Sequence, residues 1–398
     1  MMTFSMGRLP RIEFGAGSLA RLPELAAAEG RRLLMVTGGR SFTSTDHWDA
    51  LQQGLHERGC NWELLRVDGE PSPEQIDAAV GEYRDRGIDV VIGIGGGSVL
   101  DAAKAIAGLL KPGNSVMDHL EGVGPELPYR GPATPFIAVP TTAGTGSEAT
   151  KNAVLTRHGA DGFKKSFRDE RLVAAWAIVD PDLLIGCPPA LIAANGMDAF
   201  TQLLESFVSI RSNPMTDALA RSGLRAARDG LLAWHTGGEG AAAGRERMAY
   251  ASLLSGICLA QTGLGSVHGL AQPLGSFFPI AHGVVCGTLL AAATRVNLEA
   301  LRERQPESPA LAKYAEVGRM LAGDERLDAD AAQSALLTTL DDWTRQLRLP
   351  NLSALGVSHS DCDRIVAHSR GSSMKTNPVT LTDAEIRLIV EARLDAAA

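Results

Sequence analysis

The sequence predicts an α/β N-terminal domain with a parallel, Rossmann-like sheet, followed by an all-α C-terminal domain formed by a helical bundle. Over residues 1–185, short apolar runs alternate with amphipathic stretches, as strands and crossover helices do in a parallel sheet. After Pro188 no convincing strand pattern appears, and long, nearly apolar helical stretches follow. We therefore expect two domains, residues 1–185 and residues 186–398.

Six strands are expected in the first domain. They cover residues 11–15, 33–37, 62–67, 89–94, 136–139 and 177–181, with the first at an edge of the sheet. Several are apolar throughout, which is typical of parallel strands buried on both faces. Helices are expected between them over residues 18–28, 47–58, 74–86 and 99–110.

Seven helices are expected in the second domain. They cover residues 191–209, 213–234, 245–262, 283–297, 309–322, 328–347 and 382–394. Several are nearly apolar all round, so they should be buried helices of one bundle rather than surface helices.

The composition is that of a globular protein with a large core, at 45% hydrophobic and 21% charged residues. A net charge of −8 argues against nucleic-acid and anionic-membrane partners. Five scattered cysteines are typical of reduced thiols in a cytoplasmic protein. The sequence shows no signal pattern and no run of eighteen apolar residues, and we expect a cytoplasmic protein without a membrane partner.

Polar side chains interrupt two otherwise apolar, glycine-rich stretches. Asp198 and Gln202 are four residues apart, which places them on one face of a helix. His268 and His282 lie in the second stretch. Carboxylate oxygen and imidazole nitrogen form the ligand set of a zinc or iron site. On pattern alone, a helix cap and satisfied core histidines are the alternative.

A glycine run follows the clearest strand. Gly95, Gly96, Gly97 and Ser98 connect residues 89–94 to the next helix. Such a turn brings backbone N–H groups and a positive helix end close to a phosphate, and its place after a buried strand favours ligand binding. A tight turn that binds nothing is the alternative, because this is not the G-x-G-x-x-G fingerprint.

Five sequence motifs, in order along nearly the whole chain, resemble the iron-containing (group III) metal-dependent alcohol dehydrogenases. They are Gly-Gly-Gly-Ser at 95–98, Thr-Thr-Ala-Gly-Thr-Gly-Ser-Glu at 141–148, Gly-Met-Asp-Ala at 196–199, Val-His-Gly-Leu-Ala-Gln-Pro-Leu-Gly at 267–275 with His282-Gly283, and Asn377-Pro378. The resemblance implies the fold shared with dehydroquinate synthase, and reversible hydride transfer between NAD or NADP and a small alcohol or aldehyde. We also expect a homodimer or higher homo-oligomer.

The resemblance also implies a cofactor site in the cleft between the domains. Its residues would be Gly38 and Gly39, then Gly95, Gly96, Gly97 and Ser98 for the phosphates, Thr141, Thr142, Thr145 and Ser147 near the nicotinamide, and Asn152 and Lys164 along the cleft. Lys165 replaces Lys164 if the spacing is one residue off. Gly38 stands where many members have an acidic residue that repels a 2′-phosphate. NADP should therefore be tolerated, with Arg40 either meeting the phosphate or facing water.

For the metal, the family uses one aspartate and three histidines. Asp198, His268 and His282 match, but Gln202 occupies the fourth place. Three outcomes are open. Gln202 binds the metal through its side-chain oxygen, or it does not bind and the site has three protein ligands, or the site has lost its metal. We expect the side chain of Gln202 to face one Fe²⁺ or Zn²⁺ ion. Because three protein ligands plus water is an ordinary catalytic zinc arrangement, zinc is slightly favoured over iron. Gln272 replaces a substrate-side histidine, and it can hydrogen-bond a substrate without acting as an acid or base.

Two alternative functions remain open. One is a glycerol dehydrogenase or dehydroquinate synthase type of enzyme on the same fold, and the other is a metal-free dinucleotide-binding protein, which Gln202 and Gln272 would permit.

Overall fold

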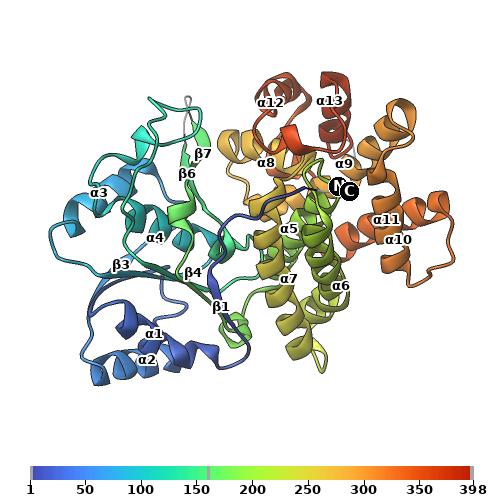
Figure 1. Cartoon of the computed structure of the whole chain (residues 1–398). Coiled ribbons are helices and arrows are strands. Elements are labelled where there is room, and N and C mark those ends of the chain that lie inside the picture. The colour runs from blue at the N-terminus through green and yellow to red at the C-terminus, as the bar shows by residue number, and fades with distance from the viewer. Residues whose placement is uncertain (1–2, 159–161, 395–398) are drawn as a thin grey trace. The chain divides into compact units, whose positions relative to one another are not determined.

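A computed structural model describes residues 3–158 and 162–394 of the chain. It divides into two compact units (Figure 1). The first comprises Ser5–Gly186, and the second begins at Cys187 and also includes Thr3 and Phe4. This boundary falls one residue from the position expected from the sequence.

The first unit is built on a six-stranded sheet whose strands all run parallel. From edge to edge the strands are β1 (Arg11–Phe14), β8 (Trp176–Val179), β5 (Phe136–Pro140), β4 (Val90–Gly95), β2 (Arg32–Thr37) and β3 (Asn61–Arg66). The predicted parallel sheet is confirmed, and so is the edge position of β1. The central strand β4 is buried along its whole length, as its run of apolar residues and glycine predicts.

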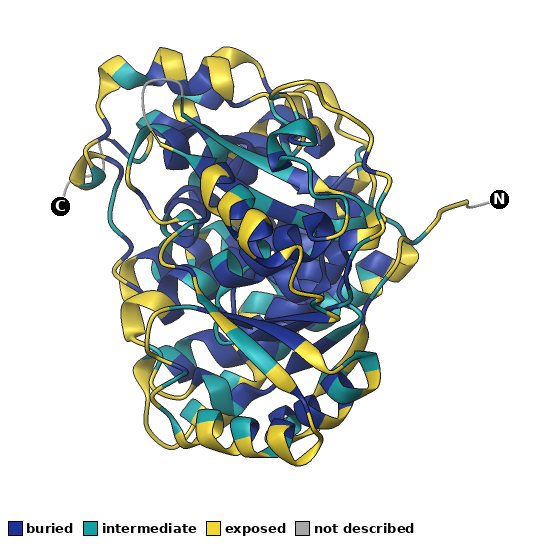
Figure 2. Ribbon diagram, turned by 90° about the vertical axis from the view of Figure 1, so that its left-hand side faces the viewer, coloured by how far each residue is buried: buried dark blue, intermediate teal, exposed yellow. Residues whose placement is uncertain are grey.

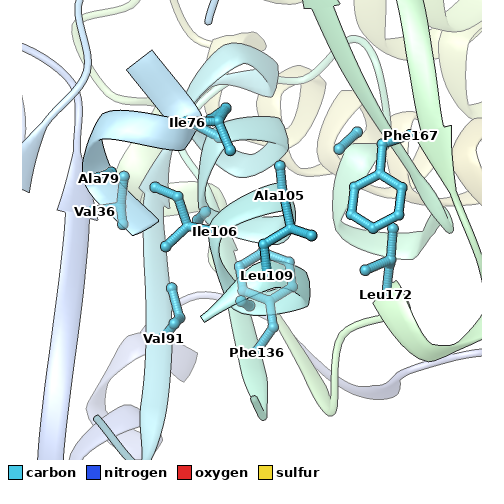
Figure 3. Close-up of a cluster of buried hydrophobic side chains, with 14 of the residues drawn as sticks. Val36, Ile76, Ala79, Val91, Ala105, Ile106, Leu109, Phe136, Phe167 and Leu172 are labelled. Carbon is cyan, nitrogen blue, oxygen red and sulfur yellow. The ribbon is translucent and has the colours of Figure 1, made fainter. Parts of the chain in front are cut away.

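Helices cover both faces of this sheet, so two apolar layers form. On one face α1 (Leu22–Glu29) and α2 (Asp46–Glu57) contribute to a core with the inward side chains of β2 and β4. On the other face α3 (Pro73–Tyr83) and α4 (Gly97–Leu109) form the second layer. Figure 3 shows Ala105, Ile106 and Leu109 of α4 between strand residues such as Val91 and the side chains of Phe167 and Leu172. This burial fixes the position of α4, the helix that follows the glycine run.

A β-hairpin lies outside the main sheet, and the prediction of six strands missed it. It consists of β6 (Asn152–Arg157) and β7 (Phe163–Arg168), which pair antiparallel. The sequence of β7, Phe-Lys-Lys-Ser-Phe-Arg, is too polar to stand out as a strand. Its buried Phe167 nevertheless packs in the same core as α4, and that tertiary contact stabilises the hairpin.

The second unit is helical, and the structure contains no strand between residues 187 and 394. Its helices are α5 (Pro189–Val208), α6 (Pro214–Thr236), α7 (Ala241–Thr262), α8 (Ser266–Phe277), α9 (His282–Arg304), α10 (Pro309–Ala322), α11 (Ala329–Gln346), α12 (Cys362–His368) and α13 (Asp383–Glu391). The sequence analysis missed α8 and α12 and ended α9 seven residues early. In α8, Pro273 and the glycines obscure the helical pattern, because both residue types are unfavourable inside a helix.

Two of these helices are largely buried. Sixteen of the twenty residues of α5 are buried. The helix α9 is long and apolar enough to cross a membrane by composition alone, but 83% of its most apolar window is buried inside the unit. It therefore behaves as a core helix. In Figure 2 the outer turns of the covering helices are exposed and the inner elements are buried.

Candidate active site

Three helices of the second unit bring together an acidic side chain and two imidazoles. Asp198 lies in the middle of α5, His268 in the first turn of α8, and His282 at the first position of α9. The Oδ1 atom of Asp198 is 3.3 Å from His268 Nε2 and 3.7 Å from His282 Nε2. Asp198 and His268 are buried, whereas His282 is partly exposed. Three of the four side chains predicted to bind a metal thus lie close together, and their oxygen and nitrogen donors suit one divalent ion. Metal binding itself stays a prediction.

Close packing between α5 and α9 places His282 beside Asp198. Gly283 follows His282, and a Cβ atom built on Gly283 would lie 2.5 Å from the backbone oxygen of Ala194. A side chain there would push α9 away from α5. Glycine at this position therefore brings His282 and Asp198 within reach of one ion.

Glu205 orders the first turn of α8, and the sequence analysis missed this role. It lies seven residues after Asp198 and faces the same side of α5. Its carboxylate accepts hydrogen bonds from the backbone N–H groups of Gly265 (3.0 Å) and Val267 (2.7 Å), at the free N-terminus of α8. It also lies 2.7 Å from His268 Nδ1. Glu205 thus accepts the Nδ1 proton and leaves Nε2 of His268 free to face Asp198 and a metal.

Asn377 caps the same helix end from a distant segment. Its Oδ1 atom accepts from the backbone N–H of Ser266 at 3.0 Å, and its Nδ2 donates to Asn297 Oδ1 at 2.7 Å. The Asn377-Pro378 motif therefore has a structural role that supports the position of His268.

The electrostatics of the cluster favour a cation. Burial would lower the pKa of His268, but Cys286 and the hydrogen bonds with Asp198 and Glu205 raise it well above its ordinary value. Burial would raise the pKa of Asp198, but the charge of His282 and the hydrogen bond from His268 lower it to about 2. A divalent ion would compete with the proton on His268, so its binding should weaken as the pH falls.

A fourth group with a metal-binding atom lies in the cluster, and sequence reasoning missed it. Cys286 is one helical turn after His282 on α9 and is fully buried. Its Sγ atom is 3.6 Å from His268 Nε2 and 3.7 Å from His282 Nε2. One ligand atom from each of Asp198, His268, His282 and Cys286 lies within 4.8 Å of every other. The i, i+4 spacing of His282 and Cys286 was the available signal, whereas all five cysteines had been interpreted only as buried thiols.

Gln202 lies in the expected direction but is already hydrogen-bonded. It is buried one turn after Asp198, and its Oε1 atom accepts a hydrogen bond of 3.0 Å from Ser255 Oγ on α7. Its side chain also hydrogen-bonds to Asp198, which helps to hold the pKa of that carboxyl low. Gln202 therefore has polar partners without a metal, and its role as a ligand stays a prediction. Ser255 is 53 residues away in the chain, so no local pattern could reveal it.

Gln272 lies one turn beyond His268 on α8 and is partly buried. Its side-chain Oε1 points to Gly371, where an added Cβ atom would lie 2.6 Å from it. Its contact with substrate stays a prediction.

The glycine loops of the first unit meet at one place on the sheet. From β2 the chain passes to β3 on one side and then returns to β4 on the other. The carboxyl ends of β2 and β4 therefore form a topological switch point, which is where open α/β sheets bind ligands. Gly38 and Gly39 follow β2, and Gly95 to Gly97 end β4 and begin α4.

The N-terminus of α4 lets other groups come close to its backbone. Its cap residue, Gly96, offers no side-chain hydrogen bond, so the first N–H groups of the helix stay available to an anion such as a phosphate. A Cβ atom on Gly97 would lie 2.7 Å from Thr145 Oγ1, and one on Gly96 would lie 3.3 Å from Thr142. The loop after β5, which carries Thr141, therefore packs directly on the glycine run. Ser98 lies in the first turn of α4.

A buried lysine, which the sequence analysis did not single out, ties this loop to α4. Lys104 Nζ donates to Ser147 O (2.8 Å), Ser147 Oγ (3.1 Å), Thr150 Oγ1 (2.9 Å) and Asn152 O (2.6 Å). Ser147 Oγ donates in turn to Asp101 at 2.6 Å. The Ser147 hydroxyl and the Asn152 carbonyl thus hold the loop in place. Whether these two residues also contact a cofactor stays a prediction.

Lys164 forms an ion pair inside the first unit. It lies on β7 opposite Thr156, and its ammonium group pairs with Glu70, which also accepts from Thr156 Oγ1 at 2.6 Å. The fallback residue, Lys165, faces the opposite side of the strand, because successive side chains alternate. Its Nζ lies beside Gly122.

An acidic side chain from another part of the first unit lies beside the loop after β2. A Cβ atom on Gly39 would lie 3.7 Å from Asp68 Oδ1, whereas one on Gly38 would meet only Val99 at 3.6 Å. Arg40 and Ser41 are exposed. Asp68 follows β3, so the fold brings a carboxylate to the position that the local sequence leaves without one.

Known proteins match the chain along nearly its whole length. Residues 10–181 match the model of iron-containing alcohol dehydrogenase, and residues 192–394 match that of the C-terminal part of the Fe-containing alcohol dehydrogenase family. Alcohol dehydrogenase 4 of Saccharomyces cerevisiae (strain YJM789) is 30% identical over 381 residues, which is 95% of each chain.

Solved structures are similar as well. That of 1,3-propanediol oxidoreductase has a TM-score of 0.89 at 27% identity, and covers 98% of this chain and 100% of its own. That of sulfoacetaldehyde reductase from Bifidobacterium kashiwanohense in complex with NAD+ has a TM-score of 0.85 at 26% identity, with 100% of both chains covered.

Proposed function

The chain belongs to the iron-containing alcohol dehydrogenase family, and from this premise we propose that it is a cytoplasmic, metal-dependent dehydrogenase with its metal held by Asp198, His268 and His282. As in the family, it is an oxidoreductase that acts on alcohols and aldehydes and uses NAD(P) and a divalent metal. The convergence of one carboxylate and two imidazoles on a single point is the observation that carries the assignment.

The residues of the cluster fit a divalent ion in kind and in charge. Asp198 contributes a full negative charge, and Glu205 directs His268 so that Nε2 faces the cluster. A bound ion would supply Lewis-acid stabilisation of negative charge on the substrate oxygen. The partly exposed His282 forms the open side of the site, from which a small alcohol would enter.

The first unit would bind the nicotinamide cofactor. Gly95 to Gly97 and the free N-terminus of α4 suit its phosphates, and the loop that carries Thr142 and Thr145 packs against them. The cofactor itself supplies or accepts the hydride. Gln272 would orient the substrate by hydrogen bonding, since an amide has no titratable proton near neutral pH. The proton would then leave through water or a cofactor ribose hydroxyl.

Metal analysis of the purified protein, combined with a screen of NADH and NADPH oxidation against small aldehydes, tests this proposal. We expect about one divalent ion per chain and aldehyde-dependent oxidation that a chelator abolishes. A protein that binds nucleotide and no metal would instead be a dinucleotide-binding protein. Turnover of a phosphorylated cyclisation substrate, without aldehyde reduction, would indicate the dehydroquinate synthase type. The homo-oligomeric state, which the sequence leads us to expect, can be measured on the same sample by light scattering.

The choice between NADH and NADPH should depend on charge at Gly38. We expect the wild type to accept NADPH and the Gly38→Asp variant to shift preference toward NADH by roughly tenfold, since a carboxylate beside the 2′-phosphate adds a like-charge repulsion of about 1.4 kcal/mol. The new side chain fits, because its Cβ atom would meet only Val99 at 3.6 Å. The ratio of kcat/KM for the two cofactors gives the measurement.

Gly38→Asn is the matched control, because it adds the same shape without the charge and should leave the ratio nearly unchanged. Strong rejection of NADPH by the wild type would show that Gly38 is not the discriminating position. In that case Asp68→Asn should relieve the rejection, because Asp68 is the carboxylate beside Gly39.

A further inference from the structure

We propose that Cys286 supplies the fourth protein ligand of the metal site, in the role that Gln202 would otherwise have, and that the site therefore selects Zn²⁺ over Fe²⁺. This inference rests on the proposed function, because it concerns the same metal. It goes further by naming a ligand that sequence similarity does not assign and the ion that this ligand favours.

The distances between the donor atoms support a four-ligand site. In a tetrahedral zinc site, bonds of about 2.0 to 2.1 Å to nitrogen or oxygen and about 2.3 Å to sulfur place N and O donors about 3.3 Å apart and S and N donors about 3.5 Å apart. The separations here are 3.3 Å and 3.7 Å from Asp198 Oδ1 to the two imidazoles. From Cys286 Sγ to the same imidazoles they are 3.6 Å and 3.7 Å. These four separations are close to the tetrahedral values, and the two remaining pairs of donors lie within 4.8 Å.

The hydrogen bonds of Gln202 leave the fourth place of the site open to another ligand. Its oxygen accepts from Ser255 Oγ, and its side chain also hydrogen-bonds to Asp198. The amide is therefore already engaged with Ser255 and Asp198, and turning its oxygen to the metal would break the contact with Ser255. Gln202 and Ser255 are both buried, so breaking their hydrogen bond would cost free energy that water could not restore.

Cys286 has the complementary placement. It follows His282 by four residues, so α9 presents imidazole and thiol on the same face. Cys286 is fully buried, and its Sγ atom lies close to both imidazoles of the cluster. On binding, the thiol proton would leave to solvent, and the thiolate would bond to the metal. One carboxylate and one thiolate balance the two positive charges of the ion.

A thiolate donor also changes which metal is favoured. Thiolate is a soft ligand that suits Zn²⁺, and divalent zinc already binds more tightly than divalent iron at most nitrogen and oxygen sites. A mixed set of O, N, N and S donors should therefore retain zinc when both ions are supplied. With these four residues holding it, the ion would supply Lewis-acid stabilisation of negative charge on the substrate.

Cobalt substitution tests the proposal directly, because a thiolate bound to Co²⁺ produces an intense charge-transfer absorption in the near ultraviolet. We expect the wild-type protein, stripped with a chelator and reloaded with Co²⁺ alone, to show this band. The Cys286→Ser variant should lack it. Its zinc affinity should fall by more than the roughly 10- to 100-fold that loss of an outer partner of a metal ligand costs. Cys258→Ser is the matched control, since Cys258 is buried on α7 and donates to Thr216 O, outside the cluster.

A rescue variant separates ligand loss from a folding defect. Adding Gln202→His to Cys286→Ser supplies an imidazole at the place where the family has its third histidine, so metal retention against a chelator should return without the charge-transfer band. Competition between Zn²⁺ and Fe²⁺ should then shift toward iron relative to the wild type.

Two results would overturn the proposal while leaving the proposed function intact. One is stoichiometric Co²⁺ binding by the wild type without a charge-transfer band, and the other is a Cys286→Ser variant that retains zinc as tightly as the wild type. If the wild type instead binds no metal and still reduces aldehydes, then the metal-dependent function itself is wrong.

Discussion

Replacing His268 by alanine should remove the metal and lower turnover by at least about 1,000-fold, the loss expected when about 4 kcal/mol of Lewis-acid stabilisation disappears. Among the proposed ligands, His268 is contacted by two carboxylates, because Glu205 accepts from its Nδ1 and Asp198 lies 3.3 Å from its Nε2. Without the imidazole, Asp198 and Glu205 would also face each other across a buried space.

Metal content by elemental analysis and aldehyde reduction should fall together. His235→Ala serves as the matched control, since His235 lies in the last turn of α6, away from the cluster, and its loss should leave both quantities unchanged. Full turnover by a His268→Ala protein shown to be free of metal would rule out a catalytic metal at this site.

The part of the fold that the sequence predicts well is the part whose pattern is local. The apolar run of β4 and the following glycines are visible in a window of ten residues. The alternation that predicts a parallel sheet is then the succession of such local segments along the chain. The hairpin of β6 and β7 is different, because polar residues such as Lys164 and Lys165 dominate one strand. Its stability comes from Phe167 in the core beneath α4, a contact that no local window contains.

The metal site divides in the same way. Asp198, His268 and His282 were found because their residue types and flanking motifs identify them. Cys286 was missed although it is only four residues from His282, because its chemistry depends on the imidazoles that the fold places beside it. The partner of Gln202 is Ser255 on another helix, so the choice between a ligand and a supporting amide could not be made from α5 alone.

The second large effect is a loss of stability when Lys104 is replaced, the buried lysine that ties the loop after β5 to α4. Lys104→Met should lower the free energy of unfolding by about 3 to 5 kcal/mol, the typical cost of removing one partner from a buried ionic network. The ammonium group donates to Ser147, Thr150 and the backbone oxygen of Asn152, and Asp101 lies 3.8 Å away. Methionine fills the space but leaves these acceptors without their donor and Asp101 without its nearest positive charge.

The difference in stability between wild type and variant should also depend on pH. Burial lowers the pKa of Lys104 from 10.5 to about 8, against the opposing charges of Asp101 and Glu148. Between about pH 8 and 10.5 the unfolded chain therefore holds a proton on this lysine that the folded chain has released. The contribution of Lys104 to the free energy of unfolding therefore rises with pH through that window. The methionine variant lacks this contribution, so the difference in stability between the two proteins should be larger at the higher pH.

Thermal and urea unfolding of the full chain, followed by circular dichroism at pH 7 and pH 9.5, measures both effects. Lys111→Met is the matched control, because Lys111 is exposed just after α4 and its replacement should change stability by no more than about 0.5 kcal/mol. Since Lys104 holds the loop of Ser147 against α4, the variant should also bind NADH more weakly, in proportion to the loop's loss of order. An unchanged melting temperature with unchanged NADH affinity would show that this network positions neither the loop nor the helix.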